Sequence, residues 1–313
     1  MEVFKITLLN VFIIILYIIP GFVFGKTKKI DIAHLSSFSM LLVYVCMPLM
    51  IISSFLSMGD YVKEDFIQMT IFFFVSLLIQ LVFFIILYLI LRKKYEDARI
   101  RIFNVGSMLG NVGFIGLPII KAILPTYSIV SCFSCVYTCS MNLLVFTIGV
   151  FAITKDKKYI SLKKALLNPA SFGLIIALPL YLLNAHKYIP TELQSAISIF
   201  GKMTTPLCMI ILGVRLSQAN IKNMFNNIFI YLNILTKMVI FPILAYFSVK
   251  YIKDLSYEFK ASILVLSAVP AASMVLNLAE LVHQEEELSA NVVLITTLAS
   301  VITIPLVTLL LNI

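Results

Sequence analysis

Ten apolar runs, each long enough to cross a lipid bilayer, constrain this chain more than any other feature. A membrane-spanning helix needs about 20 consecutive, mostly apolar residues. The runs cover residues 3–24, 35–57, 66–91, 102–123, 127–153, 168–185, 193–216, 225–251, 260–282 and 288–312. The linkers between them are too short to form a soluble domain. We therefore predict an all-α polytopic membrane protein with ten transmembrane helices, whose function lies within the membrane.

The composition supports this prediction and excludes other classes. Hydrophobic residues make up 61% of the 313 residues and charged residues 12%, whereas soluble domains are about 45–50% apolar and about 25% charged. A cytosolic enzyme, a nucleic-acid binder and a disordered chain are excluded. The net charge of +9 comes from basic residues in short loops. These residues indicate topology and contacts with anionic lipids. We expect the lipid bilayer, and no nucleic acid, as a partner.

The loop charges predict an orientation. Lys and Arg gather in the loops that follow the first, third, fifth and seventh runs, including the central loop at 154–167 and, after the seventh run, Lys222. Because basic loops stay in the cytoplasm, we place the central loop inside and both termini outside a plasma membrane.

The two halves of the chain match at a constant offset of 158 residues. Asn10 opens the first run and Asn168 the sixth, and Pro48 and Pro206 lie at equivalent places in the second and seventh runs. Five spans in each half make the repeats inverted, which is typical of secondary transporters. The predicted organisation is a first repeat at 1–153, a short cytoplasmic loop at 154–167 and a second repeat at 168–313.

The fourth and ninth runs are predicted to be broken helices that cross. The fourth holds four glycines and a proline between residues 106 and 118, and the ninth holds Pro270 among small residues. Such stretches do not form stable helices, and their free backbone groups must be satisfied by protein or water. Half-helix N-termini at the membrane centre would favour an anion. The predicted helix-break residues are Gly110, Gly116, Pro118 and Pro270.

These residues carry a family resemblance. The segment Gly-Asn-Val-Gly-Phe-Ile-Gly-Leu-Pro-Ile-Ile-Lys-Ala at 110–122 resembles the fourth-helix motif of the auxin efflux carrier family, and residues 268–280 are similar to its ninth-helix motif. The resemblance implies an elevator-type carrier with helices 1, 2, 6 and 7 as scaffold and helices 3–5 and 8–10 as transport domain. The short central loop indicates a prokaryotic, malate/malonate permease-type member. Homodimerisation through the scaffold helices stays open.

Polar residues at membrane depth are the candidate site. Asn111 offers neutral donors beside the first break, and Asn142 matches an amide position of the family's prokaryotic members. The full set of predicted substrate-binding residues is Asn111, Gly113, Pro270, Ala271, Ser273, Asn142 and Asn277. Lys237 and, at nearly the equivalent place in the first repeat, Gln80 are predicted to serve ion coupling or charge. Alternatively, Lys237 pairs structurally with a carbonyl or with Glu280.

The remaining titratable residues give no sign of metal or catalytic chemistry. Cys132, Cys135 and Cys139 share a helix face without an interleaved His or carboxylate, so we predict apolar packing, no metal site and no cofactor. The spans hold no Asp and no deep His, so we predict no enzyme activity.

The predicted function is secondary transport of a small organic anion by an elevator mechanism. A malate- or malonate-like carboxylate and an auxin-like acid both suit the crossover. The alternative is a membrane channel or sensor for organic anions.

Overall fold

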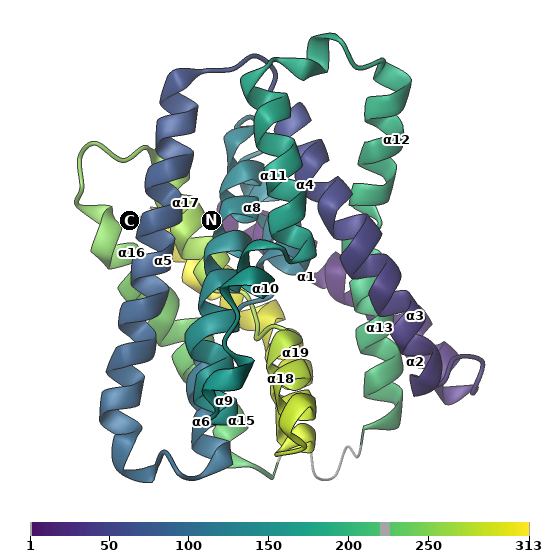
Figure 1. The fold of residues 1–313 in the computed structure, drawn as a ribbon, viewed down its shortest axis with the longest axis vertical. Coiled ribbons are helices and arrows are strands. Elements are labelled where there is room, and N and C mark those ends of the chain that lie inside the picture. Colours follow the sequence, from purple (N-terminus) through teal and green to yellow (C-terminus); the bar gives the residue numbers. More distant parts are fainter. Residues whose placement is uncertain (1, 220–225, 313) are drawn as a thin grey trace.

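The computed structural model describes residues 2–219 and 226–312. Within these ranges every secondary-structure element is a helix (Figure 1). Eight helices in these ranges are long and apolar enough to cross a membrane. The prediction of an all-α polytopic membrane protein is thus confirmed as to its helical class and its several apolar helices of membrane-spanning length. Lys222 and the predicted start of the eighth run at residue 225 lie outside the described residues.

The helices of the first half run from α1 to α9. Their bounds are α1 (Glu2–Leu16), α2 (Ile18–Lys26), α3 (Ile32–Leu41), α4 (Met47–Leu56), α5 (Lys63–Leu91), α6 (Ala98–Met108), α7 (Leu117–Ile123), α8 (Ile129–Leu144) and α9 (Val150–Thr154). This half also holds three π-helical segments. η1 (Leu42–Cys46) and η4 (Val145–Gly149) are continuous with the helices on both sides, whereas η3 (Val112–Gly116) is continuous only with α7.

The second half begins with a helix inside the predicted central loop. Its bounds are α10 (Leu162–Leu166), α11 (Pro169–Leu182), α12 (Thr191–Lys202), α13 (Thr204–Gln218), α15 (Ile228–Leu235), π-helix η7 (Thr236–Ile240), α16 (Phe241–Lys250), α17 (Tyr257–Ser267), α18 (Met274–Val282) and α19 (Glu286–Thr308). The segment 154–167 is therefore partly helical rather than an open loop, because Ser161 caps α10 by accepting a hydrogen bond from the Lys164 N–H.

Prolines explain three of the π-helical segments. Pro48, Pro118 and Pro242 each stand two residues after the last residue of η1, η3 and η7. A proline has no N–H to donate to the preceding turn, and a local widening of the helix accommodates this missing bond. These prolines therefore widen their helices without breaking them.

One group of helices is held together by backbone contact at small residues. A Cβ built on Gly21 of α2 would lie 2.0 Å from the Ile210 carbonyl oxygen, and one built on Gly213 of α13 would lie 2.1 Å from the Ile18 oxygen. Gly173 of α11 and Gly201 of α12 meet the α4 backbone in the same way. Glycines allow such close approach in membrane helices. In Figure 1, α2, α3, α4, α12 and α13 form one side of the molecule.

A second group packs through large side chains. Here α5 packs on α8, α16 on α17, and α15 on α19. The rings of Phe72 and Phe133 stack at 4.4 Å between centroids, and Phe259 meets Phe72 edge-on at 4.8 Å. This aromatic layer joins α5, α8 and α17. Aromatic contacts therefore hold these three helices together, whereas glycine contacts hold the first group.

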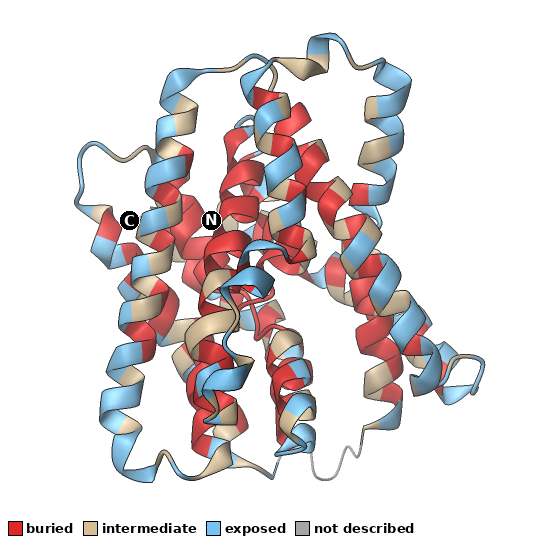
Figure 2. Ribbon diagram, viewed as in Figure 1, coloured by how far each residue is buried: buried red, intermediate tan, exposed pale blue. Residues whose placement is uncertain are grey.

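Burial separates interior helices from peripheral ones (Figure 2). In the span Ile129–Thr154, 72% of the most apolar window is buried, against 28% in Lys63–Lys94. The exposed side chains of α5 are large and apolar, Phe74 and Ile90 among them. Because an apolar surface of this size is stable in lipid, α5 faces the bilayer and α8 lies in the protein core.

Candidate functional site: the crossover

Two helix interruptions meet in the middle of the molecule. The first separates α6 from η3 at residues 109–111, and the second separates α17 from α18 at residues 268–273. Gly110 and Ala271 form an antiparallel β-bridge. The Asn111 N–H donates to the Pro270 carbonyl at 2.8 Å, and the Ala272 N–H donates to the Leu109 carbonyl at 3.1 Å. The two extended segments thus satisfy one another's backbone groups, as membrane depth requires.

Side chains from neighbouring helices satisfy the remaining amides of the bridge. The Ala271 N–H donates to Thr296 Oγ1 of α19 at 3.1 Å, and the Gly110 N–H points at Met141 Sδ of α8 at 3.4 Å. Sulfur is a weak acceptor compared with a hydroxyl oxygen. The second interruption is therefore held more firmly by its surroundings than the first.

Gly110 is required at the bridge because no side chain fits there. A Cβ on Gly110 would lie 2.8 Å from Val269 Cγ2 and 3.0 Å from Lys237 Nζ. A Cβ on Gly113, by contrast, would meet nothing closer than Met50 Cε at 3.4 Å. Glycine therefore allows a close approach of neighbouring side chains at Gly110 and at Gly116, where a Cβ would lie 2.9 Å from Leu266 Cδ2, but is not needed for this at Gly113.

Lys237 lies against the crossover with its ammonium fully buried. Nζ donates a 2.7 Å hydrogen bond to the carbonyl of Ser267, the last residue of α17, and lies 4.8 Å from the ring centroid of Phe241. Among the described residues it has no carboxylate within ion-pair distance. Of the two alternative partners predicted from the sequence, the backbone carbonyl is the one observed, whereas Glu280 pairs with Arg215 at 3.4 Å.

Asn111 stands where the bridge faces α13. Asn111 is 6% exposed. η3 begins at the next residue, and α18 begins after Ser273. The N-terminal ends of both half-helices therefore converge at the crossover, where their exposed amides favour negative charge.

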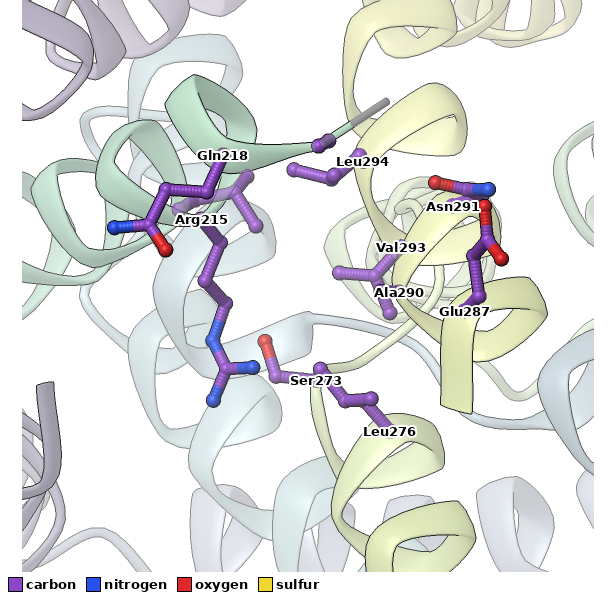
Figure 3. A pocket seen from close by; sticks show the side chains of 11 residues that line it. Arg215, Gln218, Ser273, Leu276, Glu287, Ala290, Asn291, Val293 and Leu294 are labelled. Carbon is purple, nitrogen blue, oxygen red and sulfur yellow. The ribbon is translucent and has the colours of Figure 1, made fainter. Parts of the chain in front are cut away.

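Two cavities flank the crossover, one lined by Arg215 and Glu287 and the other by two lysines. One, of about 340 Å³, lies between α13, α18 and α19, and Figure 3 shows its Arg215 side chain reaching toward Ser273 at the start of α18. The other, of about 280 Å³, lies between α7 and the helices α1, α4, α12 and α13. Lys121 and Lys202 line it together with Asn10, and no carboxylate is among its lining residues.

The structure gathers some predicted site residues and separates others. Asn111, Pro270 and Ala271 form the bridge, and Ser273 lines the larger cavity. Asn277 lies one turn further along α18 and is exposed. Asn142 instead donates to Asn168 Oδ1 at 3.1 Å, at the cap of α11.

Gln80 and two helix-break residues lie elsewhere than predicted. Gln80 donates to the Ser76 carbonyl and to Ser140 Oγ, so it belongs to the contact between α5 and α8 and not to the surroundings of Lys237. The prediction that Gly116 and Pro118 break the helix was wrong. Gly116 ends η3, and Pro118 is in the first turn of α7, where its missing N–H is tolerated. The break is limited to residues 109–111.

Sequence reasoning missed several residues of the site. Thr296 and Met141 gave no signal, because Thr and Met are ordinary residues in apolar helices. Lys121, Lys202 and Arg215 were not among the predicted site residues, yet they line the two cavities. Their shared positive charge next to glycine- and proline-broken helices was the available signal.

The fold and the crossover define a membrane transporter, and comparison with known proteins supports this class. The family model described as "Membrane transport protein" matches residues 6–308. The chain therefore belongs to this transporter family, and the resemblance to the auxin efflux carrier family is confirmed. The chain is also similar to the uncharacterized transporter MJ1031 of Methanocaldococcus jannaschii, with 25% identity over 309 residues, covering 95% of this chain and 96% of that protein.

Proposed function

We propose that this transporter is a secondary carrier of a small organic anion, with the carboxylate of the substrate held at the crossover. The observation that carries the proposal is the bridge of two half-helices beside a cavity lined by Lys121 and Lys202 without a carboxylate. The cavity on the other flank is lined by one basic residue, Arg215, and one acidic residue, Glu287. Converging helix N-termini attract an anion. Lys121, Lys202 and Arg215 attract it on the way. Malate- or malonate-like carboxylates and auxin-like acids fit this chemistry.

The proposed mechanism is an elevator. Here α1–α4 and α11–α13 are the scaffold, and α5–α9 with α15–α19 are the transport domain, in ten spans arranged as two inverted repeats. One contact supports the repeat: Thr204 Oγ1 donates to the Cys46 carbonyl at 3.3 Å, and these positions are 158 residues apart. Equivalent residues meet in this way at a pseudo-two-fold axis. Both cavities lie between the two proposed bodies, where movement of one body would open and close them.

A channel or sensor for organic anions is the second candidate, and the core of the crossover argues against a channel. Leu109 and Lys237 are fully buried at the crossover and line neither cavity. A channel needs a continuous polar path, whereas these cavities are separated by closed backbone. The proposed location is a plasma membrane, with both termini outside and the loop 154–167 in the cytoplasm.

Uptake into proteoliposomes tests the function. The purified protein should take up at least one of malate, malonate, a monocarboxylate and an indole acid, with saturation and with counterflow, which a channel does not give. Binding should depend on Asn111. Losing a buried polar partner costs about 1–3 kcal/mol, so Asn111→Ala should weaken binding by about tenfold.

Asn111→Asp is the matched variant, because it keeps the shape of the side chain and adds a charge that repels an anion. It should bind more weakly than Asn111→Ala. A normal melting temperature in both variants is the control for folding. Unchanged binding in both would remove Asn111 from the site, and linear, non-saturating flux in the wild type would favour the channel.

A further inference from the structure

The amine group of Lys237 is fully buried in the core of the protein. The side chain leaves the π-helix η7 and ends on the carbonyl of Ser267, at the C-terminal end of α17. A helix C-terminus carries partial negative charge, and the nearby ring face of Phe241 adds a cation–π contact. These groups hold the ammonium in place, but none of them carries a formal negative charge.

Among residues 2–219 and 226–312, no carboxylate lies within ion-pair distance of the Lys237 amine. The helices that pack around it are α6, α15, α16, α17 and α19. Their carboxylates are Glu258 at the start of α17 and Glu286 and Glu287 at the start of α19. Glu258 is separated from Ser267 by nine residues, which is about 13 Å along a helix. Burying an uncompensated charge is costly, so its retention at this depth indicates a role in binding or transport.

The position of the ammonium relative to the bridge specifies that role. Nζ lies 3.0 Å from where a Cβ of Gly110 would stand, so it lies beside Gly110 of the first interruption. Asn111 is the next residue. The ammonium thus joins the C-terminal end of one half-helix to the extended segment of the other. A metal cation bound to the Ser267 carbonyl would lie where the ammonium lies.

We infer that Lys237 is a tethered resident cation, which offsets the negative charge of a monoanionic carboxylate at the crossover and takes the place of a sodium ion from solution. The inference rests on the proposed function and narrows its substrate class to singly charged carboxylates. With such a cargo bound, the site carries no net charge. A dianion would leave one uncompensated charge, which is expensive to move through a bilayer.

The first test uses the wild-type protein in proteoliposomes. Uptake should be equal in sodium and in N-methylglucamine buffers. Counterflow of a monocarboxylate at saturation on both sides should not respond to a potassium–valinomycin potential, because only the neutral, loaded form then moves. Sodium dependence of uptake, or voltage dependence of this exchange, would overturn the inference.

The second test changes the side chain. Lys237→Met keeps the length and removes the charge, so binding should fall about tenfold or more; Lys237→Arg should retain more binding. Lys237→Ala leaves space, so added methylammonium should restore part of its uptake without affecting the wild type. Methylammonium should not rescue Lys237→Met, whose side chain fills the space. Melting temperatures monitor folding, and the tests on the wild type stand even if a variant does not fold.

The outcomes separate this inference from the proposed function. If the wild type transports a carboxylate and Lys237→Met transports and binds it equally well, the resident-cation role is wrong and the carrier function stands. If the wild type transports only dianions, the narrowed substrate class is wrong. If the wild type transports no carboxylate, the proposed function and this inference fail together.

Discussion

The two interruptions at the crossover have similar backbones and different chemistry. The first is three residues long and depends on Gly110 and Asn111, whereas the second spans residues 268–273 and depends on Pro270 among small residues. At the helix end before the second interruption, the Ser267 carbonyl accepts a hydrogen bond from the ammonium of Lys237. The first interruption instead contains the neutral side-chain amide of Asn111. The comparison teaches that a repeated backbone can place a neutral donor in one half and a cation in the other.

The largest effect should come from filling the space at the first interruption. Gly110→Val adds a Cβ within 2.8 Å of Val269 and side-chain atoms near Lys237. Overpacking of this kind costs about 1–3 kcal/mol or more, and it also separates the bridge. We expect a clearly lower melting temperature and complete loss of transport.

Gly113→Ala is the matched control for folding. Its Cβ would contact Met50 Cε at 3.4 Å, which an adjustable Met side chain can accommodate. We expect its melting temperature to stay close to that of the wild type. A Gly110→Val protein as stable as Gly113→Ala would show that the bridge does not need the close approach.

A cross-link should stop transport without unfolding the protein. The first broken helix touches α13 through Thr205 Oγ1, which donates to the Phe114 carbonyl at 2.7 Å. In a background without the five native cysteines, Thr205→Cys and Phe114→Cys joined by a short bifunctional thiol reagent would fix these two segments. Transport should be lost and should return when a cleavable reagent is reduced. Full transport with a complete cross-link would exclude sliding and point to local gating.

The smallest expected effects compare the two side chains that accept the amides of the bridge. Thr296→Val removes the oxygen that accepts the Ala271 N–H and leaves a buried donor unpaired, at a cost of about 1–3 kcal/mol. Met141→Leu removes only a weak sulfur acceptor from the Gly110 N–H and should cost less than about 1.5 kcal/mol. Chemical unfolding in detergent measures both. Equal losses of unfolding free energy in the two variants would contradict the conclusion that neighbouring side chains hold the second interruption more firmly than the first.

Features encoded in consecutive residues could be predicted from the sequence. The long apolar runs identified the spans, and Pro270 and Gly110 marked the two interruptions, because proline and glycine act on their own backbone. The width of the first break was overestimated. Pro118 looked like a helix breaker, but its place in the first turn of α7 makes it compatible with the helix.

Contacts between distant side chains could not be predicted in the same way. Asn142 and Met141 are neighbours on α8, yet Asn142 bonds to Asn168 and Met141 points at the bridge. Successive residues on a helix point about 100° apart, and a π-helical segment changes the register again. Repeat alignment likewise relates Gln80 to the region of Lys237 without giving them the same contacts.

The sequence by itself determined that this protein is a helical membrane protein with two interrupted spans, because hydrophobic length and backbone-restricting residues act locally. Only the tertiary structure decided that the interruptions meet as a β-bridge, that Lys237 ends on Ser267, and that Lys121, Lys202 and Arg215 line cavities on the two flanks. The physical reason is that these contacts depend on how helices cross and rotate against one another, and close packing of glycines and aromatic rings from both halves of the chain fixes that arrangement.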